Sequence, residues 1–451
     1  MLATHSHLKP TRHTIEANIG ASSPAYAQDS AYLESLYRRL REDPTIRLKR
    51  ELWARLLRSA LGTGISDSDD LFIDHTLLVL EAMAIGHAVM EIPLAEAVRD
   101  IPRFIEGAEF DNAGIHGVME AGFFDWVLAA GPDGEKFIAR LIRRVDVFDW
   151  SDVEHDVLKV LYESIINSDT RKGLGEYYTP DWLAEGIVEK AISEPLIQKA
   201  LDPSCGSGTF IFHAVRRIAD AGEAEGWVNR AIVDHVQTHV FGLDIHPVSI
   251  VLARITFLLA LGERLSRDRG DVWVPVHLGD SIQWFQPAGG ETDTIRIDTR
   301  GDDLTVSDHA AGGTLFEIAH VLAFPLSTID DAGTFDRLVA DLTELAKTHT
   351  ERHANRPDPS RILRKYAIPD GADAEALRET FNLLADLNSE GRDSIWGYFV
   401  RNQVRPPLAV HAEPTSRCPD WQPSVGRLPV HDREHARAVP PVQPGPQPLA
   451  R

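Results

Sequence analysis

The segment LDPSCGSGTF at residues 201–210 decides how the chain folds. An apolar strand is predicted to end at Asp202, and a glycine-containing turn then leads into a helix that begins near Thr209. Gly206 and Gly208 are predicted to let the backbone approach a ligand closely, because glycine has no side chain to collide with it. No lysine follows the glycines and the spacing is not G-x-G-x-x-G, which argues against a phosphate-binding loop and a dinucleotide fingerprint.

Short apolar strands alternate with helical segments around this turn. The candidate strands are residues 200–202, 240–244 and 274–278, and each of the first two ends in an aspartate and runs into a helix. Strands that alternate with helices indicate a parallel, doubly wound sheet whose ligand lies at the carboxyl ends of the strands. The sequence therefore predicts an α/β, Rossmann-like domain with acidic side chains at its ligand-binding edge.

Four segments resemble the motifs of amino-group DNA methyltransferases, in the order that this family requires. They are residues 175–180 (GEYYTP, motif X), 201–210 (motif I), 242–247 (GLDIHP, motif II) and 277–281 (HLGDS, motif III). Taken singly, an acid after a strand is more often a turn residue, and Thr179-Pro180 suit the start of a helix. Together the four segments resemble an N6-adenine-specific DNA methyltransferase of a restriction-modification system, of the type I modification-subunit or type IIG kind.

This resemblance implies that the cofactor is S-adenosyl-L-methionine. Asp244 would accept hydrogen bonds from the ribose hydroxyls, a role that suits the several lone pairs of a carboxylate. Asp280 would lie beside the adenine of the cofactor, and Tyr178 and Thr179 would close over its methionine part. The cofactor-binding residues implied in this way are Tyr178, Thr179, Asp202, Pro203, Cys205, Gly206, Gly208, Asp244 and Asp280.

The spacing between the first two acids is long. Asp244 lies 42 residues after Asp202, whereas the ribose acid of a dinucleotide-binding fold follows by about 20 residues. An extra helix between Ala219 and Gln237 would account for the difference. Long spacings of this kind are similar to those of multi-domain adenine methylases, which also have a helical region before motif X.

The pattern of composition divides the chain into five parts. Residues 1–30 are expected to be a disordered lead-in, and residues 31–170 a helical domain with apolar stripes that face a core. A helix is predicted to start at a capping box formed by Ser151 and Glu154. Residues 171–285 are the expected cofactor-binding core, residues 286–407 an acidic insertion or helical extension, and residues 408–451 a foreign tail.

Charge and cysteine content limit the setting in which the protein works. The chain has 451 residues, a net charge of −22 and two cysteines, so a disulfide framework is excluded and a cytoplasmic location is expected. No signal peptide or stretch of roughly 20 apolar residues is evident, so no membrane partner is expected. The histidines and cysteines show no metal-ligand spacing, and Cys205 has no adjacent base in sequence, which favours a packing role over a nucleophilic one.

A protein that grips DNA by its phosphates is expected to have a basic face, but in this chain acidic residues outnumber basic ones 68 to 46 and no strong Lys/Arg cluster is evident. An acidic chain can still bind DNA through a local basic patch, a partner or a missing segment. The resemblance implies that double-stranded DNA is the partner, reached through a target-recognition region missing from this chain or through a separate subunit. Specificity and restriction subunits are further partners that the family implies.

One motif of the family is missing from the sequence. Methylation of an exocyclic amine requires the base to be rotated out of the duplex, and the family holds it with an Asn-Pro-Pro-aromatic tetrapeptide. No such tetrapeptide occurs in the chain. We therefore assign no catalytic residue and expect little or no activity from this chain alone.

The composition of the tail suggests a reason for the missing motif. Residues 408–451 hold nine of the 27 prolines of the chain. Back-translation of residues 421–425 (WQPSV), read one base later, permits Gly-Asn-Pro-Pro-Trp. Our hypothesis is that a single-base frameshift near residues 406–409 took the gene out of frame, and the alternative is a proline-rich disordered tail.

Two other functions remain open at this stage. The chain could be a non-catalytic subunit that binds the cofactor or a partner methylase, or a methyltransferase that acts on protein glutamine or RNA. The large helical N-terminal part and the long insertion favour the DNA enzyme.

Resequencing the gene through codons 405–451 and beyond tests the frameshift. We expect a shifted frame that encodes Asn-Pro-Pro-Trp and then stays open for a long distance. An unbroken frame that ends at Arg451, with no such motif in the shifted frames, contradicts the hypothesis and favours the cofactor-binding subunit.

Overall fold

The computed structural model describes most of the chain up to residue 389. The described residues are 8–61, 67–92, 94–119, 122–150, 153, 155–166, 171, 179–279, 294–298, 321–325, 332–352 and 357–389. Two expected site residues, Tyr178 and Asp280, lie outside them, and so does the tail at residues 408–451.

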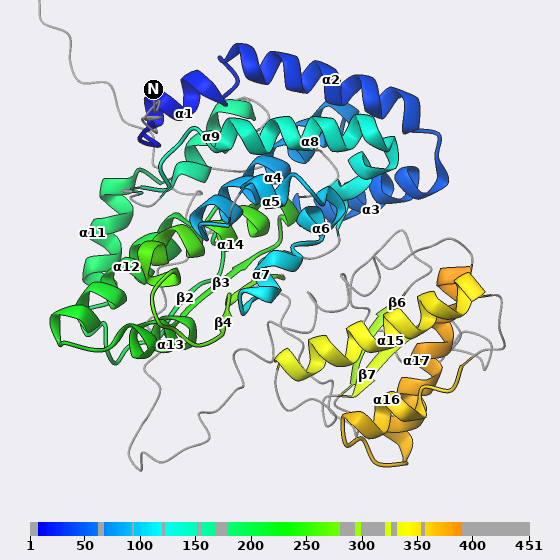
Figure 1. Cartoon of the computed structure of the whole chain (residues 1–451). Helices are drawn as coiled ribbons and strands as arrows, with labels where there is room; N and C mark the ends of the chain where they lie inside the picture. Colours follow the sequence, from blue (N-terminus) through cyan, green and yellow to red (C-terminus); the bar gives the residue numbers. More distant parts are fainter. Residues whose placement is uncertain are drawn as a thin grey trace, which may run out of the picture.

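Helices make up most of the chain ahead of the sheet (Figure 1). The elements there are α1 (Arg12–Asn18), α2 (Pro24–Leu40), α3 (Pro44–Leu61), α4 (Asp69–Val89), α5 (Leu94–Ala97), α6 (Ile101–Glu106), α7 (Ala108–Asn112), β1 (Ile115–His116), the 3-10 helix η1 (Phe124–Ala130), α8 (Pro132–Val145) and α9 (Val157–Ile165). Helix α1 and the first two turns of α2 lie where a disordered lead-in was expected, at residues 1–30. That expectation is wrong from residue 12 onward, because Thr11 and Ser23 cap two regular helices.

The helix that carries Lys159 starts later than predicted. α9 begins at Val157, and the side chain of Asp156 caps it by accepting a hydrogen bond from the Lys159 backbone N. Ser151 and Glu154 lie outside the described residues, and the described residues Val153, His155 and Asp156 are not helical.

The second part of the fold is a parallel sheet with its helices. Its elements are α11 (Asp181–Ala191), β2 (Ala200–Asp202), α12 (Thr209–Ala224), α13 (Asn229–His239), β3 (Val240–Asp244), α14 (Pro247–Leu261), the 3-10 helix η2 (Gly262–Leu265), β4 (Val272–Trp273) and β5 (Val276–Leu278). The strands β2, β3 and β5 pair in parallel in the order β2-β3-β5. The first two strands and the start of α12 are confirmed to the residue, and α13 supplies the extra helix that the long spacing required.

The strand predicted at residues 274–278 is observed only at Val276–Leu278, because the backbone changes its hydrogen-bonding partner strand at Pro275. Before this residue, β4 pairs in parallel with β1 from the helical part, and Val274 N donates to His116 O. After it, β5 pairs with β3. Proline has no N–H to donate and so separates the two pairings.

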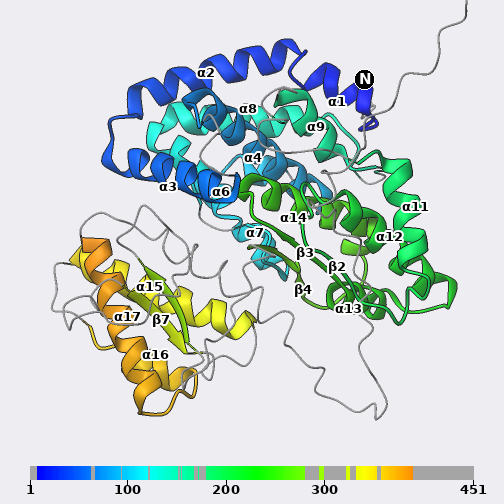
Figure 2. The same cartoon turned by 180° about the vertical axis from the view of Figure 1, so that it is seen from behind.

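Helix α14 connects the helical part to the sheet. Each of its residues is buried, and it packs against β3 and β5 on one side and against α4 on the other (Figures 1 and 2). A helix that is apolar on all sides has to be covered on all sides. The parts predicted as residues 31–170 and 171–285 therefore share a hydrophobic core.

Helix α4 is also buried on nearly all sides. By length and composition it could cross a membrane, but 89% of its apolar window is buried inside the fold. The sequence analysis expected no stretch of this kind, and α4 corrects that expectation. Its burial against α14, α2 and α8 identifies it as a core helix.

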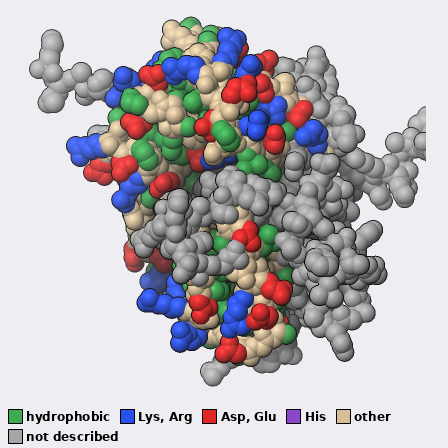
Figure 3. Space-filling view, turned by 90° about the vertical axis from the view of Figure 1, so that its right-hand side faces the viewer, with side chains coloured by type: hydrophobic (Ala, Val, Ile, Leu, Met, Phe, Trp, Pro, Cys, Tyr) green, Lys and Arg blue, Asp and Glu red, His purple; other side chains and the backbone are tan. Residues whose placement is uncertain are grey.

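A third unit follows the sheet. In it, β6 (Thr294–Asp298) pairs antiparallel with β7 (Val321–Pro325), and α15 (Ala332–Arg352), α16 (Ser360–Lys365) and α17 (Ala372–Ser389) pack beside them. These strands were not anticipated in the segment expected to be an acidic insertion. Figure 3 shows acidic and basic side chains intermixed on the described surface of one face of the molecule.

Candidate functional site

The parallel pairing of β2 and β3 brings the first two predicted acids to one edge of the sheet. Asp202 ends β2 opposite Gly242, and Asp244 ends β3 two residues further along. The turn after β2 lies over both strand ends, because Cys205 N donates to Leu243 O at 2.9 Å. This edge is the carboxyl end of the strands, where ligands of parallel α/β sheets bind.

Asp244 organises the backbone around this edge. Its Oδ2 accepts a hydrogen bond from Gly206 N at 2.8 Å, and its Oδ1 accepts one from His246 N at 2.8 Å. Burial raises the pKa of the Asp244 carboxyl, while the backbone hydrogen bonds oppose that rise. Each carboxylate oxygen can accept more than one hydrogen bond, so Asp244 keeps capacity for a ligand.

Only one of the two carboxylate oxygens of Asp202 accepts a hydrogen bond from a described residue. Its Oδ1 accepts a hydrogen bond from Ser204 N at 3.1 Å. Its Oδ2 is buried and has no hydrogen-bond partner among the described residues. Burial, together with the nearby charge of Asp244, raises the pKa of Asp202 to about 7. A buried acceptor without a partner is costly unless something supplies a donor.

The two glycines of the turn serve different purposes. Gly206 has a φ of +54°, and a Cβ added there would meet nothing within 4 Å, so its backbone faces open space. Gly208 has a φ of +98°, and a Cβ there would lie 3.1 Å from Ala253 Cα and 3.2 Å from Thr256 Cβ of α14. Gly206 therefore borders open space, and its contact with a ligand stays a prediction, whereas Gly208 allows the turn to pack on α14.

Cys205, Pro203 and Thr179 are the remaining predicted site residues that the structure describes. Cys205 is buried, and burial raises the pKa of its thiol well above the usual range, which supports packing rather than nucleophilic chemistry. Pro203 lies in the turn between β2 and α12. Thr179 precedes α11, whose N-cap is Pro180, so the helix starts one residue later than predicted. Gly279, next to the expected Asp280, donates its N–H to Asp244 O at 2.9 Å.

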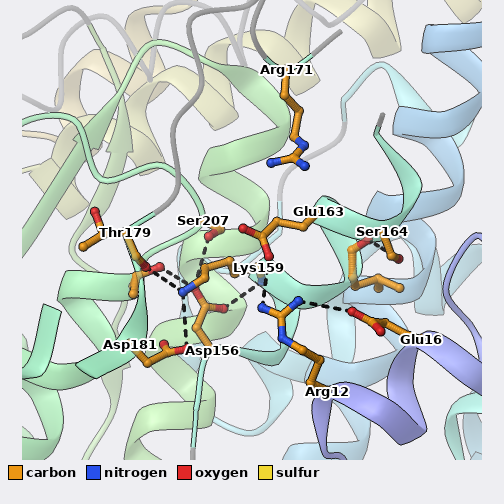
Figure 4. A network of polar contacts seen from close by, with 12 residues as sticks. Arg12, Glu16, Asp156, Lys159, Glu163, Ser164, Arg171, Thr179, Asp181 and Ser207 are labelled. Carbon is orange, nitrogen blue, oxygen red and sulfur yellow. Dashed lines mark hydrogen bonds and ion pairs between the residues drawn. The ribbon is translucent and has the colours of Figure 1, made fainter. Parts of the chain in front are cut away.

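The sequence analysis missed two charged residues at the start of α9. Asp156 is fully buried and accepts hydrogen bonds from Ser207 and Thr209 of the turn. Lys159 is buried and donates to Thr179 O at 2.7 Å (Figure 4). The sequence did contain a signal for Asp156. It is an aspartate directly before an apolar helical stripe, with a lysine three residues later, and aspartate is favoured at helix N-caps.

The turn and the two acids lie at the edge of the sheet where ligands of parallel α/β folds bind, and comparison with known proteins indicates the class of protein. Residues 153–265 match the N-6 DNA Methylase family model. This match confirms the resemblance inferred from the motifs for that part of the chain. With the parallel sheet, it assigns the segment to the S-adenosylmethionine-dependent methyltransferase fold.

Two curated relatives match part of the chain. The chain is 29% identical over 137 residues to the adenine-specific methyltransferase PglX of Streptomyces coelicolor, covering 27% of this chain and 11% of that protein. It is 22% identical over 195 residues to a protein of Methanocaldococcus jannaschii named as a type II restriction enzyme and methyltransferase, covering 29% of this chain and 16% of that protein. The chain thus spans less than a fifth of the length of either relative.

Three solved structures, two of them of Type ISP restriction-modification enzymes, show weak similarity to this chain. They are DrdV in a DNA complex (TM-score 0.37, 13% identity, 56% of this chain and 24% of that chain), LlaGI with a DNA substrate mimic (0.33, 17%, 57% and 20%) and LlaBIII bound to DNA (0.30, 16%, 56% and 17%).

Stability should depend on pH through Asp202. The pKa of Asp202 in the folded protein is about 7, and an unfolded aspartate titrates near about 4. Between these values the folded state binds more protons, so this group makes the protein less stable as pH rises through the window. Asp202→Asn should therefore raise the free energy of unfolding at pH 8, on the order of 1 kcal/mol, and have little effect at pH 4.

Urea unfolding of both proteins at the two pH values measures this difference. Asp220→Asn, which changes an exposed carboxylate paired with Arg264, is the control and should show no such pH-dependent gain. An Asp202→Asn variant that is equally or less stable than the wild type at pH 8 contradicts the expectation.

Proposed function

We propose that this chain provides the S-adenosyl-L-methionine-binding part of a methyltransferase that acts on N6 of adenine in DNA. The observation that carries the proposal is the pair of acids, Asp202 and Asp244, at adjacent strand ends beneath the glycine turn. The match of residues 153–265 to the N-6 DNA Methylase family supports adenine in DNA, rather than RNA or protein glutamine, as the substrate class.

The residues present fit the cofactor. The amino group of its methionine part is a cationic donor, which suits Asp202 Oδ2, a buried oxygen with no hydrogen-bond partner in the part of the chain that the structure describes. Its ribose offers two vicinal hydroxyls, which suit the free lone pairs of Asp244. The open space at Gly206 leaves room for the ligand to lie against the backbone of the turn. When bound, the cofactor supplies a methyl group carried on a positively charged sulfur.

The roles of the protein side chains follow from these positions. Asp202 would bind and orient the methionine end, and the negative charge at this edge would complement the cationic ligand. Asp244 would fix the ribose. Tyr178, Thr179 and Asp280 are proposed, on the motifs alone, to complete the site. The Asn-Pro-Pro-aromatic tetrapeptide that would hold the adenine is not in this sequence.

The partner is proposed to be double-stranded DNA. With a net charge of −22, the chain would need a basic target-recognition region or subunit to reach the DNA phosphates. We propose a cytoplasmic protein of a restriction-modification or defence system, with specificity or restriction subunits as further partners.

Isothermal titration with S-adenosylmethionine tests the proposed function. The wild-type chain should bind the cofactor saturably, and Asp244→Ala should weaken binding about tenfold or more because the ribose hydroxyls lose a charged acceptor. Asp271→Ala is the control, since it removes an exposed carboxylate just before β4. It should bind as the wild type does.

A methyl-transfer assay with duplex DNA completes the test. No methyl transfer is expected from this chain alone, because the sequence does not contain the Asn-Pro-Pro-aromatic tetrapeptide that would hold the target amine. The absence of saturable cofactor binding to the wild-type chain contradicts the proposal.

A further inference from the structure

The first turn of α9 contacts both segments proposed to hold the cofactor. Asp156, immediately before the helix, divides its carboxylate between two tasks. Its Oδ1 caps α9 by accepting from Lys159 N at 3.0 Å and also lies 3.4 Å from Thr256 Oγ1 of α14. Its Oδ2 accepts from Ser207 Oγ at 3.1 Å and Thr209 Oγ1 at 2.9 Å, both on the glycine turn or the start of α12.

The second oxygen is not needed for the helix. One side-chain acceptor is enough to cap an N-terminus, whereas burying a carboxylate is costly unless its oxygens are hydrogen-bonded. Asp156 is fully buried. Its Oδ2 therefore has a role outside α9, and the side chains that it holds flank Gly208.

Lys159 makes the corresponding contact with the other segment. Its side chain is 3% exposed, and its Nζ donates to Thr179 O at 2.7 Å and to Asp181 Oδ2 at 3.3 Å (Figure 4). Asp181 also lies 3.8 Å from His213 Nε2 on α12. The backbone that leads into α11 is thus tied to α9 and lies close to α12.

We propose that Asp156 and Lys159, named here the α9 pair, are positioning residues for cofactor binding. Asp156 holds the glycine turn through Ser207 and Thr209, and Lys159 holds the Thr179 segment. The inference rests on the proposed function. Its physical basis is that glycines give the turn many accessible conformations, and a turn fixed in advance loses less entropy when a ligand binds.

Asp156→Ser separates the two tasks of Asp156. Serine caps a helix about as well as aspartate does, but its short side chain keeps only the capping contact and gives up the second oxygen. We expect about a tenfold loss of affinity for S-adenosylmethionine, measured by titration calorimetry well below the unfolding temperature of each variant. Asp100→Ser is the matched control, because Asp100 caps α6 through Arg103 N at 3.1 Å in the same way. Its affinity should equal that of the wild type.

A double-mutant cycle shows whether Asp156 acts through the two hydroxyls. The Ser207→Ala/Thr209→Val variant should lose affinity to a similar extent. Combining it with Asp156→Ser should add little, because both changes remove the same contacts. Losses that multiply instead, or an Asp156→Ser affinity within twofold of the wild type, overturn the proposal for Asp156.

Lys159→Met tests the other member of the pair. It should also weaken cofactor binding several-fold, because the Thr179 carbonyl loses its charged donor. Lys49→Met is the control, since Lys49 is a partly buried lysine that pairs with Asp125 in the helical part. Equal affinities for the two lysine variants overturn the role of Lys159.

Amide hydrogen exchange, measured without cofactor, tests the positioning role of Asp156 independently of the proposed function. The amides of Cys205, Gly206 and Gly208 are hydrogen-bonded within the site. They should exchange faster in Asp156→Ser than in the wild type, while those of α4 should not. Faster exchange in a chain that binds no cofactor supports the positioning of the turn but contradicts the proposed function. Unchanged exchange overturns the positioning role.

Discussion

The pairing of β2 with β3 is the interaction on which the site depends. Parallel register places Asp202 and Asp244 at one edge of the sheet, where the two carboxylates have little water and repel each other. Burial, with a smaller contribution from the nearby charge of Asp244, raises the pKa of Asp202 to about 7. Under the proposed function, a cationic ligand would relieve this repulsion, so that the edge combines lower stability with ligand binding, as functional sites commonly do.

The helices ahead of the sheet help to fix the position of this edge through their packing on α14. Helix α14 starts just after Asp244 and is covered by α4, so the position of β3 depends on helices more than 150 residues earlier in the chain. His246 caps α14 through its ring Nδ1, and its ring lies 5.3 Å from that of His75 on α4. Burial lowers the pKa of both histidines, so the contact joins two uncharged rings in the core.

Local sequence signals predicted the strand ends and the turn of the site. They did not predict the features that depend on contacts between segments far apart in the sequence. Strand ends at Asp202 and Asp244 and the start of α12 follow from apolar runs that stop at an acid or a glycine turn. Asp156 was missed because Ser151 and Glu154 offered a competing capping pattern. The β1–β4 pairing was missed because two-residue strands have no periodicity, and their partners lie far apart in sequence.

Counting protons tests most directly whether this edge binds the cationic cofactor. Titration of the chain with S-adenosylmethionine at pH 6.5, in buffers of different ionisation enthalpy, gives the number of protons exchanged on binding. At this pH Asp202 is mostly protonated, so a cation beside it should release about half a proton or more, and Asp202→Asn should abolish that release. Binding without proton release in the wild type, or with the same release in Asp202→Asn, would contradict the role assigned to Asp202 and with it the account of the site.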